Sequence, residues 1–234
     1  MRYLGLLGGM SWESTVEYYR QLNTAVAARM GGLHSAPLLL HSVDFAKIAE
    51  LQEEDNWAAA GALLAQAARG LAQAGAEALV VCTNTMHAVA PAIEETVDIP
   101  LIHIVDVTGA ALQAAGIRRA GLLGTRYTME QPFWRERLQQ RCGIELVVPA
   151  AEERVLVHRV IFEELCRGIV TDASRAAYVE IIEGLAAQGA EAVILGCTEI
   201  GLLVNAADSP LPVFDTTAIH VEAAVEFILG QQVC

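Results

Sequence analysis

The sequence predicts an α/β protein made of two pseudo-symmetric domains, each built on a mainly parallel sheet. The first observation is an internal duplication: Gly-Ala-Glu-Ala-Leu-Val-Val-Cys-Thr-Asn-Thr at 75–85 resembles Gly-Ala-Glu-Ala-Val-Ile-Leu-Gly-Cys-Thr-Glu at 189–199. The second is that short Val/Ile/Leu runs alternate with Ala-rich stretches, a pattern typical of parallel strands flanked by helices. The third is the length of 234 residues, which accommodates two domains of about 100 residues each.

The first domain is expected to span 1–105. Its opening apolar segment, Gly5-Leu-Leu-Gly8, is interpreted as a strand because the chain passes into Trp12 and Glu13 without a signal-peptide cleavage site. The Ala-rich stretch 56–74 predicts a helix, and the apolar run that ends before Cys82 predicts a second strand.

The second domain, 106–215, repeats this order. Gly121-Leu-Leu-Gly124 repeats the opening segment 121 − 5 = 116 residues later, and the turns are offset by 189 − 75 = 114 residues. The stretch 172–188 predicts the matching helix. A spacing above 100 residues indicates a duplicated domain, since solenoid repeats run about 20 to 50 residues. A last helix, about 216–234, is expected to pack back on the first domain.

The carboxyl ends of the predicted strands are expected to carry the active site. In open parallel sheets, ligands bind beyond these ends. We therefore expect the turns that follow the strands of both halves to face a common cleft between the domains; these turns follow Leu7, Val81, Leu123 and Leu195.

Composition limits the classes of function. A net charge of −13 and a pI near 4.8 argue against a nucleic-acid partner, which needs basic patches. No apolar run approaches the roughly 20 residues of a membrane span, so we expect a soluble protein with no membrane partner. The five cysteines lack CxxC spacing and indicate neither a disulfide framework nor a zinc site, which favours the cytoplasm.

Cofactors are not expected either. Lys47 is the sole lysine, so it is the only candidate for a pyridoxal phosphate Schiff base. The six histidines form no H-x-x-x-H pair or Cys/His cluster, so we predict no metal site. The turn 8–11 could bind an anion through its amides, although its spacing does not fit G-x-G-x-x-G.

The aligned turns pair Thr83 with Cys197. Cys197 lies between an apolar strand and an expected helix N-terminus, where backbone N–H groups and the helix dipole favour a thiolate; we therefore expect a lowered pKa and a competent base. Alternatively, Cys197 is a small buried hydrophobe. Thr83 and the two polar residues after it could cap the next helix, which is compatible with catalysis. Cys82 aligns with Gly196 and should point to the opposite face of its strand from Thr83.

Three motifs resemble the aspartate/glutamate racemase family: Gly-Gly-Met-Ser-Trp-Glu-Ser-Thr at 8–15, Cys-Thr-Asn-Thr-Met-His at 82–87 and Gly-Cys-Thr-Glu-Ile at 196–200. The resemblance covers nearly the whole chain. It implies two α/β domains, a homodimer, and cofactor-independent interconversion of amino-acid enantiomers by two cysteines on opposite faces of the substrate Cα.

The sequence departs from that pattern where Thr83 replaces the first cysteine. An alcohol is a far weaker acid than a thiol, so Cys197 would abstract the proton and Thr83 would serve the opposite face. The resemblance therefore implies a racemase for L-aspartate and L-glutamate whose preference for the L-enantiomer is kinetic. The strand-end argument places the substrate-binding groups, which are the side chains of Asn84, Thr85 and Thr198 and the amides of Gly9 and Met10. The resemblance adds Gln52, which lies in a segment where family members carry substrate-binding residues.

The partner of the distal carboxylate stays open, because Cys166 stands where family members carry a lysine; Arg167 is an alternative partner. Two other functions also stay open. A single-cysteine decarboxylase of the arylmalonate type would protonate an enediolate with one thiol. A catalytically inactive amino-acid-binding protein would keep the site without turnover.

Overall fold

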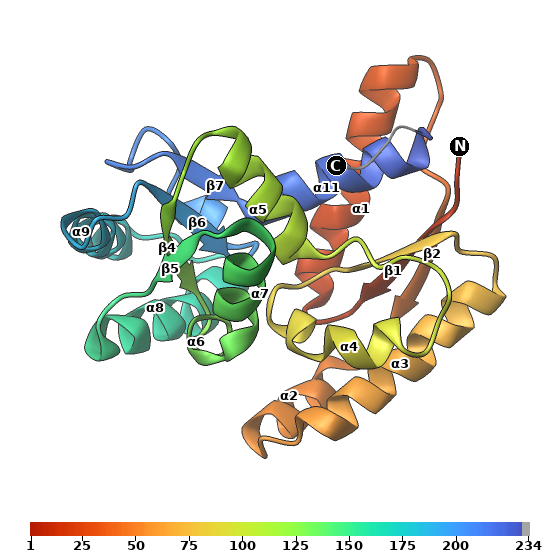
Figure 1. The fold of residues 1–234 in the computed structure, drawn as a ribbon, viewed down its shortest axis with the longest axis horizontal. Coiled ribbons are helices and arrows are strands. Elements are labelled where there is room, and N and C mark those ends of the chain that lie inside the picture. The colour runs from red at the N-terminus through yellow and green to blue at the C-terminus, as the bar shows by residue number, and fades with distance from the viewer. Residues whose placement is uncertain (231–234) are drawn as a thin grey trace. The chain divides into compact units, whose positions relative to one another are not determined.

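The computed structural model describes residues 1–230, so the expected end of the last helix, 231–234, and Cys234 lie outside the described residues. The chain divides into two compact units. Unit 1 is Met1–Val107 together with the chain from His220 onward, and unit 2 is Thr108–Ile219. In each unit, helices flank a set of strands (Figure 1).

Unit 1 follows the alternating order that the sequence predicts. Its elements are β1 (Leu4–Gly8), α1 (Trp12–Met30), β2 (Leu38–Ser42), α2 (Phe45–Glu53), α3 (Trp57–Gln73), β3 (Ala78–Val81), the 3₁₀ helix η1 (Thr85–Val89) and α4 (Ala90–Glu94). Helix α5 (Ile104–Ala114) begins in unit 1 and ends in unit 2, and α11 (Thr216–Ile228) runs from unit 2 into unit 1.

The sheet of unit 1 has the strand order β2-β1-β3, and all its pairs are parallel. Leu101 extends it through a parallel bridge to Leu79 on β3. Strands β1 and β3 are buried at every position, as expected for parallel strands covered on both faces. Helix α3 covers one face and α1 the other (Figure 1).

Helix α3 shows why the sequence folds this way. Asn56 caps its first turn by accepting a hydrogen bond from the Ala59 amide at 3.2 Å. Its buried residues form one apolar face against the sheet. Those that belong to the core cluster recur every three or four positions along the helix, and they are Ala60, Leu64, Ala67, Ala68 and Leu71. The helix expected at 56–74 is therefore confirmed.

Unit 2 repeats the arrangement. Its elements are β4 (Arg119–Gly124), α6 (Arg126–Glu130), α7 (Pro132–Cys142), β5 (Glu145–Val147), α8 (Ala151–Glu163), the 3₁₀ helix η2 (Leu165–Arg167), α9 (Asp172–Ala187), β6 (Ala192–Gly196), α10 (Ile200–Leu203) and β7 (Val213–Asp215). The sheet has the order β5-β4-β6-β7, and all pairs are again parallel.

The two sheets have the same topology. In each, the first strand lies in the interior between the second and third, and the last segment, which is the bridge at Leu101 in unit 1 and β7 in unit 2, joins the third. In register, Leu7 pairs with Val81 and Leu123 pairs with Leu195. The pseudo-symmetric α/β fold expected from the duplication is confirmed.

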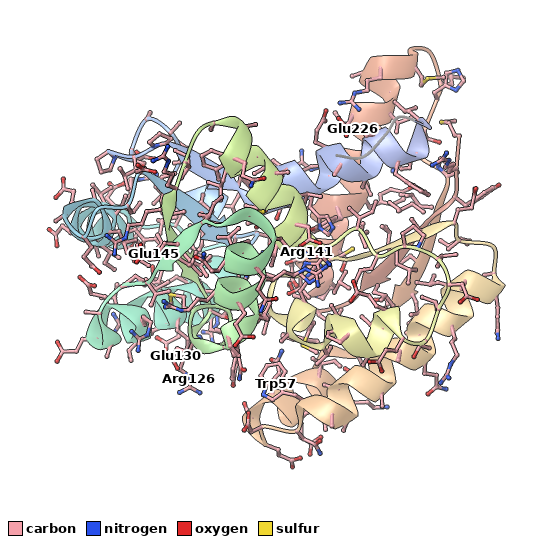
Figure 2. All side chains as sticks on the ribbon, viewed as in Figure 1. Trp57, Arg126, Glu130, Arg141, Glu145 and Glu226 are labelled. Atoms are coloured by element: carbon pink, nitrogen blue, oxygen red, sulfur yellow. The ribbon has the colours of Figure 1, made fainter. Side chains whose placement is uncertain are left out.

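Ion pairs of unit 2 lie at its surface. The Arg154 Nε atom is 3.0 Å from Glu130 Oε1, which links α8 to α6, and Arg119 pairs with Glu145 across the β4–β5 pair at 2.8 Å. Figure 2 labels the two acids of these pairs, Glu130 and Glu145. Among residues 1–230, no helix has the length and apolar character needed to cross a membrane.

Candidate active site

Equivalent strand ends position the two turns that hold the candidate catalytic residues. Thr83 follows β3, and Cys197 follows β6 in the equivalent sheet. Both residues are partly exposed, whereas the residues immediately before them, Cys82 and Gly196, are buried. Each unit therefore has a partly exposed hydroxyl or thiol residue at the equivalent position after its third strand.

Two glycines bring the strand ends of unit 2 together. Gly124 on β4 pairs with Gly196 on β6. A Cβ atom on Gly196 would lie 3.0 Å from the Leu123 carbonyl oxygen and 2.8 Å from Leu122 Cδ1. Only glycine fits this close backbone approach, which fixes the point where Cys197 leaves the sheet.

The Cys197 thiol is bound to a carboxylate. Its Sγ atom donates a hydrogen bond to Glu199 Oε2 at 2.9 Å, and Thr198 Oγ1 donates to the same oxygen at 2.6 Å. Glu199 is buried, with 9% of its surface exposed. The thiol proton therefore already points at a base two residues along the chain.

This pairing corrects the expectation of a lowered thiol pKa. Loss of water around the thiol raises the pKa of Cys197 well above its ordinary range, and the negative charge of Glu199 and its hydrogen bond add to the increase. The helix that follows, α10, has only four residues, and no side chain caps its start. A helix this short supplies little dipole to oppose a neighbouring carboxylate, so Cys197 rests as a thiol.

In unit 1, a histidine binds the backbone of Thr83. The ring nitrogen Nδ1 of His87 lies 2.8 Å from the Thr83 carbonyl oxygen, and the Ile104 amide lies 3.3 Å from its Nε2. Since a carbonyl can only accept, Nδ1 carries the proton and Nε2 accepts. His87 is 1% exposed, and burial together with the nearby His103 and His220 holds its pKa well below the ordinary value.

The other residues expected in this turn lie close around Thr83. Asn84 and Thr85 are buried, with 4% and 7% of their surfaces exposed. Asn84 occupies the N-cap position of η1, but its side chain makes no capping bond. Gln52, at the end of α2, donates from Nε2 to the Met86 sulfur at 3.0 Å. Gln52, Asn84 and Thr85 are thus brought together at one turn of unit 1.

The turn at Gly9 does not offer the free amide that was expected to bind a substrate carboxylate. That amide donates to Thr15 Oγ1 at 2.8 Å, so the amide is already satisfied within the protein. Gly9 itself has a φ of 91°, and a Cβ there would lie 2.3 Å from the Val43 carbonyl oxygen. The Met10 side chain is 4% exposed and belongs to the hydrophobic core of unit 1.

The remaining thiols differ in exposure. Cys82 is fully buried, and burial raises the pKa of its thiol. Cys166 is partly exposed in η2, a 3₁₀ helix that contacts α10, and its proximity contributes to the raised pKa of Cys197. Arg167, the next residue, is exposed. In residues 1–230, no three side chains of the His, Cys, Asp and Glu types gather into a group that could hold a metal ion.

Sequence reasoning missed two residues of these turns, Glu199 and His87. Each follows its reactive residue closely, at two positions after Cys197 and four after Thr83. An acidic residue this near a cysteine, and a histidine one helical turn beyond a reactive residue, were available signals. Their partners depend on turn geometry, which the spacing alone does not determine.

The fold and the paired turns define a class of protein. Two duplicated parallel α/β units, each with one hydroxyl or thiol residue after its third strand, match the aspartate and glutamate racemase class. A model of the Asp/Glu/Hydantoin racemase family matches residues 7–224. The chain belongs to this family, whose aspartate and glutamate racemases are isomerases.

Solved relatives share the whole fold. The chain is 55% identical to a Yersinia pestis protein assigned as an Asp/Glu racemase, over 98% of this chain and 100% of that one, with a TM-score of 0.93. It is 31% identical to an aspartate racemase homologue from Pyrococcus horikoshii OT3, over 98% and 100% of the two chains, with a TM-score of 0.84.

A glutamate racemase from Persephonella marina matches more narrowly. It is 25% identical over 138 residues, which cover 55% of this chain and 48% of that protein. The match thus spans about half the length of that relative.

Proposed function

We propose that this protein is a cofactor-independent racemase of L-glutamate and L-aspartate, in which Cys197 and Thr83 act on opposite faces of the substrate Cα. The observation that carries the proposal is the equivalent placement of Thr83 after β3 and Cys197 after β6. The family motifs around both turns support it. The reaction requires both residues to reach the Cα atom of one substrate molecule.

In the proposed reaction, Glu199 activates Cys197. The thiol proton moves to Glu199 Oε2, which already accepts its hydrogen bond at 2.9 Å. The thiolate then removes the Cα proton of the L-enantiomer and leaves a carbanion. On the opposite face, Thr83 passes a proton to Cα and takes one from solvent, so no alkoxide accumulates. Glu199 returns its proton to solvent, which restores the starting state of the site.

The two faces are unequal because a thiolate is a far better base than an alcohol at neutral pH. Enantiomers have equal free energy. The value of kcat/KM for net conversion is therefore the same from L to D as from D to L, whichever enantiomer the enzyme deprotonates more readily. A preference for L-substrates therefore shows as exchange of the Cα proton with solvent that exceeds net conversion. We expect this excess with L-glutamate and L-aspartate.

The test follows deuterium incorporation at Cα by proton NMR in D₂O, without added pyridoxal phosphate and in the presence of a chelator. Wild-type protein should exchange the L-substrates. Cys197→Ser should abolish this exchange, and Thr83→Cys should gain exchange of the D-substrates and faster net conversion. Cys142→Ser is the matched control, because it removes a partly exposed thiol of unit 2, on α7, that lies outside the proposed pair.

Other outcomes would replace the proposal. Carbon dioxide release from a disubstituted malonate, without amino-acid exchange, would indicate a single-cysteine decarboxylase. Tight binding of L-glutamate that Cys197→Ser leaves unchanged, again without exchange, would indicate an amino-acid-binding protein. A homodimer and a cytoplasmic location, both expected from sequence, stay part of the proposal and are checked by light scattering and cell fractionation.

A further inference from the structure

The buried imidazole of His87 connects the Thr83 turn to the start of α5. Its Nδ1–H donates to the Thr83 carbonyl at 2.8 Å, and its Nε2 accepts from the Ile104 amide at 3.3 Å. These two bonds use both nitrogens of one ring. The first needs a proton on Nδ1 and the second needs Nε2 to be unprotonated, so together they require the neutral ring with its proton on Nδ1. Protonation would turn the acceptor into a donor facing an N–H group.

The surroundings hold this ring in place. His103 lies edge-on at 4.6 Å between ring centroids, and His220 lies at 5.7 Å. His220 is itself fixed, since Tyr18 Oη lies 2.8 Å from its Nδ1 and its Nε2 donates to the Ile102 carbonyl at 2.7 Å. All three rings are buried. A ring with fixed neighbours and two hydrogen bonds has little freedom to rotate.

We propose that His87 is the positioning residue for Thr83: it fixes the Thr83 backbone and thereby the direction of the Thr83 hydroxyl. The inference rests on the proposed function, because it assigns His87 to the half of the reaction that Thr83 serves. Cys197 belongs to unit 2 and is held by other contacts, through Glu199 and the Gly196 strand end. A change at His87 should therefore affect one face of the substrate and spare the other.

The activity at each face can be measured separately in a Thr83→Cys background. There, the rate of Cα exchange of the D-substrate depends on proton abstraction by residue 83, and that of the L-substrate depends on abstraction by Cys197. We expect His87→Gln to lower D-glutamate exchange about ten- to a hundredfold and to leave L-glutamate exchange within about twofold, because sub-ångström misplacement of a reacting group costs rate at that face alone. His87→Asn, whose amide can replace the Nδ1 donor, should retain more D-exchange than His87→Gln.

Equal losses at both faces, or no loss at either, would overturn the inference. Absence of exchange in the parent Thr83→Cys protein would instead count against the proposed function, so the two failures are distinguishable. Should the His87 variants fail to fold, nitrogen NMR of the wild-type histidines decides. The structure requires the tautomer protonated on Nδ1 for His87, and a tautomer protonated on Nε2 would contradict the assignment.

Discussion

Glu199 determines whether Cys197 rests as a thiol or as a thiolate. Its carboxylate lies 2.9 Å from the Cys197 sulfur and is buried, so its charge is poorly screened by water. Together with desolvation, this holds the pKa of the Cys197 thiol above its ordinary range. A resting thiol is less exposed to oxidation and alkylation, because the thiolate is the reactive form.

Replacing Glu199 by glutamine should lower the pKa of Cys197. Glu199→Gln removes a negative charge at hydrogen-bond distance, which we expect to lower the apparent pKa of the Cys197 thiol. The measurement is the pH dependence of Cys197 alkylation by iodoacetamide, followed by mass spectrometry. Exchange of L-glutamate should fall in the same variant, because the acceptor of the thiol proton is lost.

Glu77→Gln is a control on an exposed acid of unit 1 and should leave the alkylation profile unchanged. An unchanged or raised Cys197 pKa in Glu199→Gln would show that Glu199 does not set the thiol's state.

At the scale of residues, the sequence predicted where side chains lie in the fold better than it predicted their hydrogen-bond partners. The strand-end argument located Thr83 and Cys197 in their turns. It could not predict that Glu199 would bind the thiol or that Thr15 would take the Gly9 amide, because both bonds depend on the path of a turn. The expected low pKa of Cys197 was wrong for this reason.

At the scale of elements, close packing of β4 and β6 sets where Cys197 leaves its sheet. The contact depends on Gly196, because any side chain there would meet the Leu123 carbonyl at 3.0 Å and Leu122 at 2.8 Å. Helix α9 of the same unit contains a glycine in a different setting. At Gly184, the nearest atom to an added Cβ is Glu153 Oε1 at 3.9 Å, which is ordinary contact.

These two glycines make a matched pair of alanine substitutions. Gly196→Ala should destabilise unit 2 by about 2 kcal/mol or more through overpacking, and it should reduce L-glutamate exchange by displacing Cys197. Gly184→Ala should stabilise the protein by up to about 1 kcal/mol, because alanine has the higher helix propensity. Urea unfolding measures both. Equal effects of the two substitutions would contradict the close-contact argument.

The sequence predicted element boundaries well where caps and apolar periodicity agreed, as in α3 and α9. It predicted the segments after Thr83 and Cys197 less well. The sequence pattern favoured ordinary helices there, yet η1 is a five-residue 3₁₀ helix and α10 has four residues. Capping residues lie in both turns, but local side-chain hydrogen bonds, from His87 to the Thr83 carbonyl and from the Cys197 thiol to Glu199, compete with a regular helix there.

At the scale of the whole molecule, the duplication predicted the topology because each copy carries its own complete apolar pattern. The motif pairs at Gly5 and Gly121, and at Gly75 and Gly189, correspond to equivalent strands in sheets of the same order. Pattern alone could not predict the buried histidine cluster of unit 1. His87, His103 and His220 are far apart in sequence, and His220 reaches unit 1 only because the last helix returns to it.

That cluster should make the protein sensitive to acid. Burial lowers the pKa of His220 to about 4, and the pKa of His87 is also held well below its ordinary value. In the unfolded chain both histidines have a pKa of about 6.5. Below this pH the unfolded state therefore binds more protons than the folded state. Folding stability is therefore fully present above about pH 6.5 and is lost as pH falls toward 4, by about 1.4 kcal/mol per pH unit for each histidine.

Urea unfolding between pH 7 and pH 4.5 measures this slope, and His220→Gln should reduce it by about one histidine's share. Asp215 titrates in the opposite sense, because burial raises its pKa, so the difference between variant and wild type isolates the histidine. His34→Gln, at an exposed position of the same unit, should leave the slope unchanged. A slope that His220→Gln does not alter would mean that the buried ring takes up a proton in the folded protein, contrary to the role of its Nδ1 as acceptor from the Tyr18 hydroxyl.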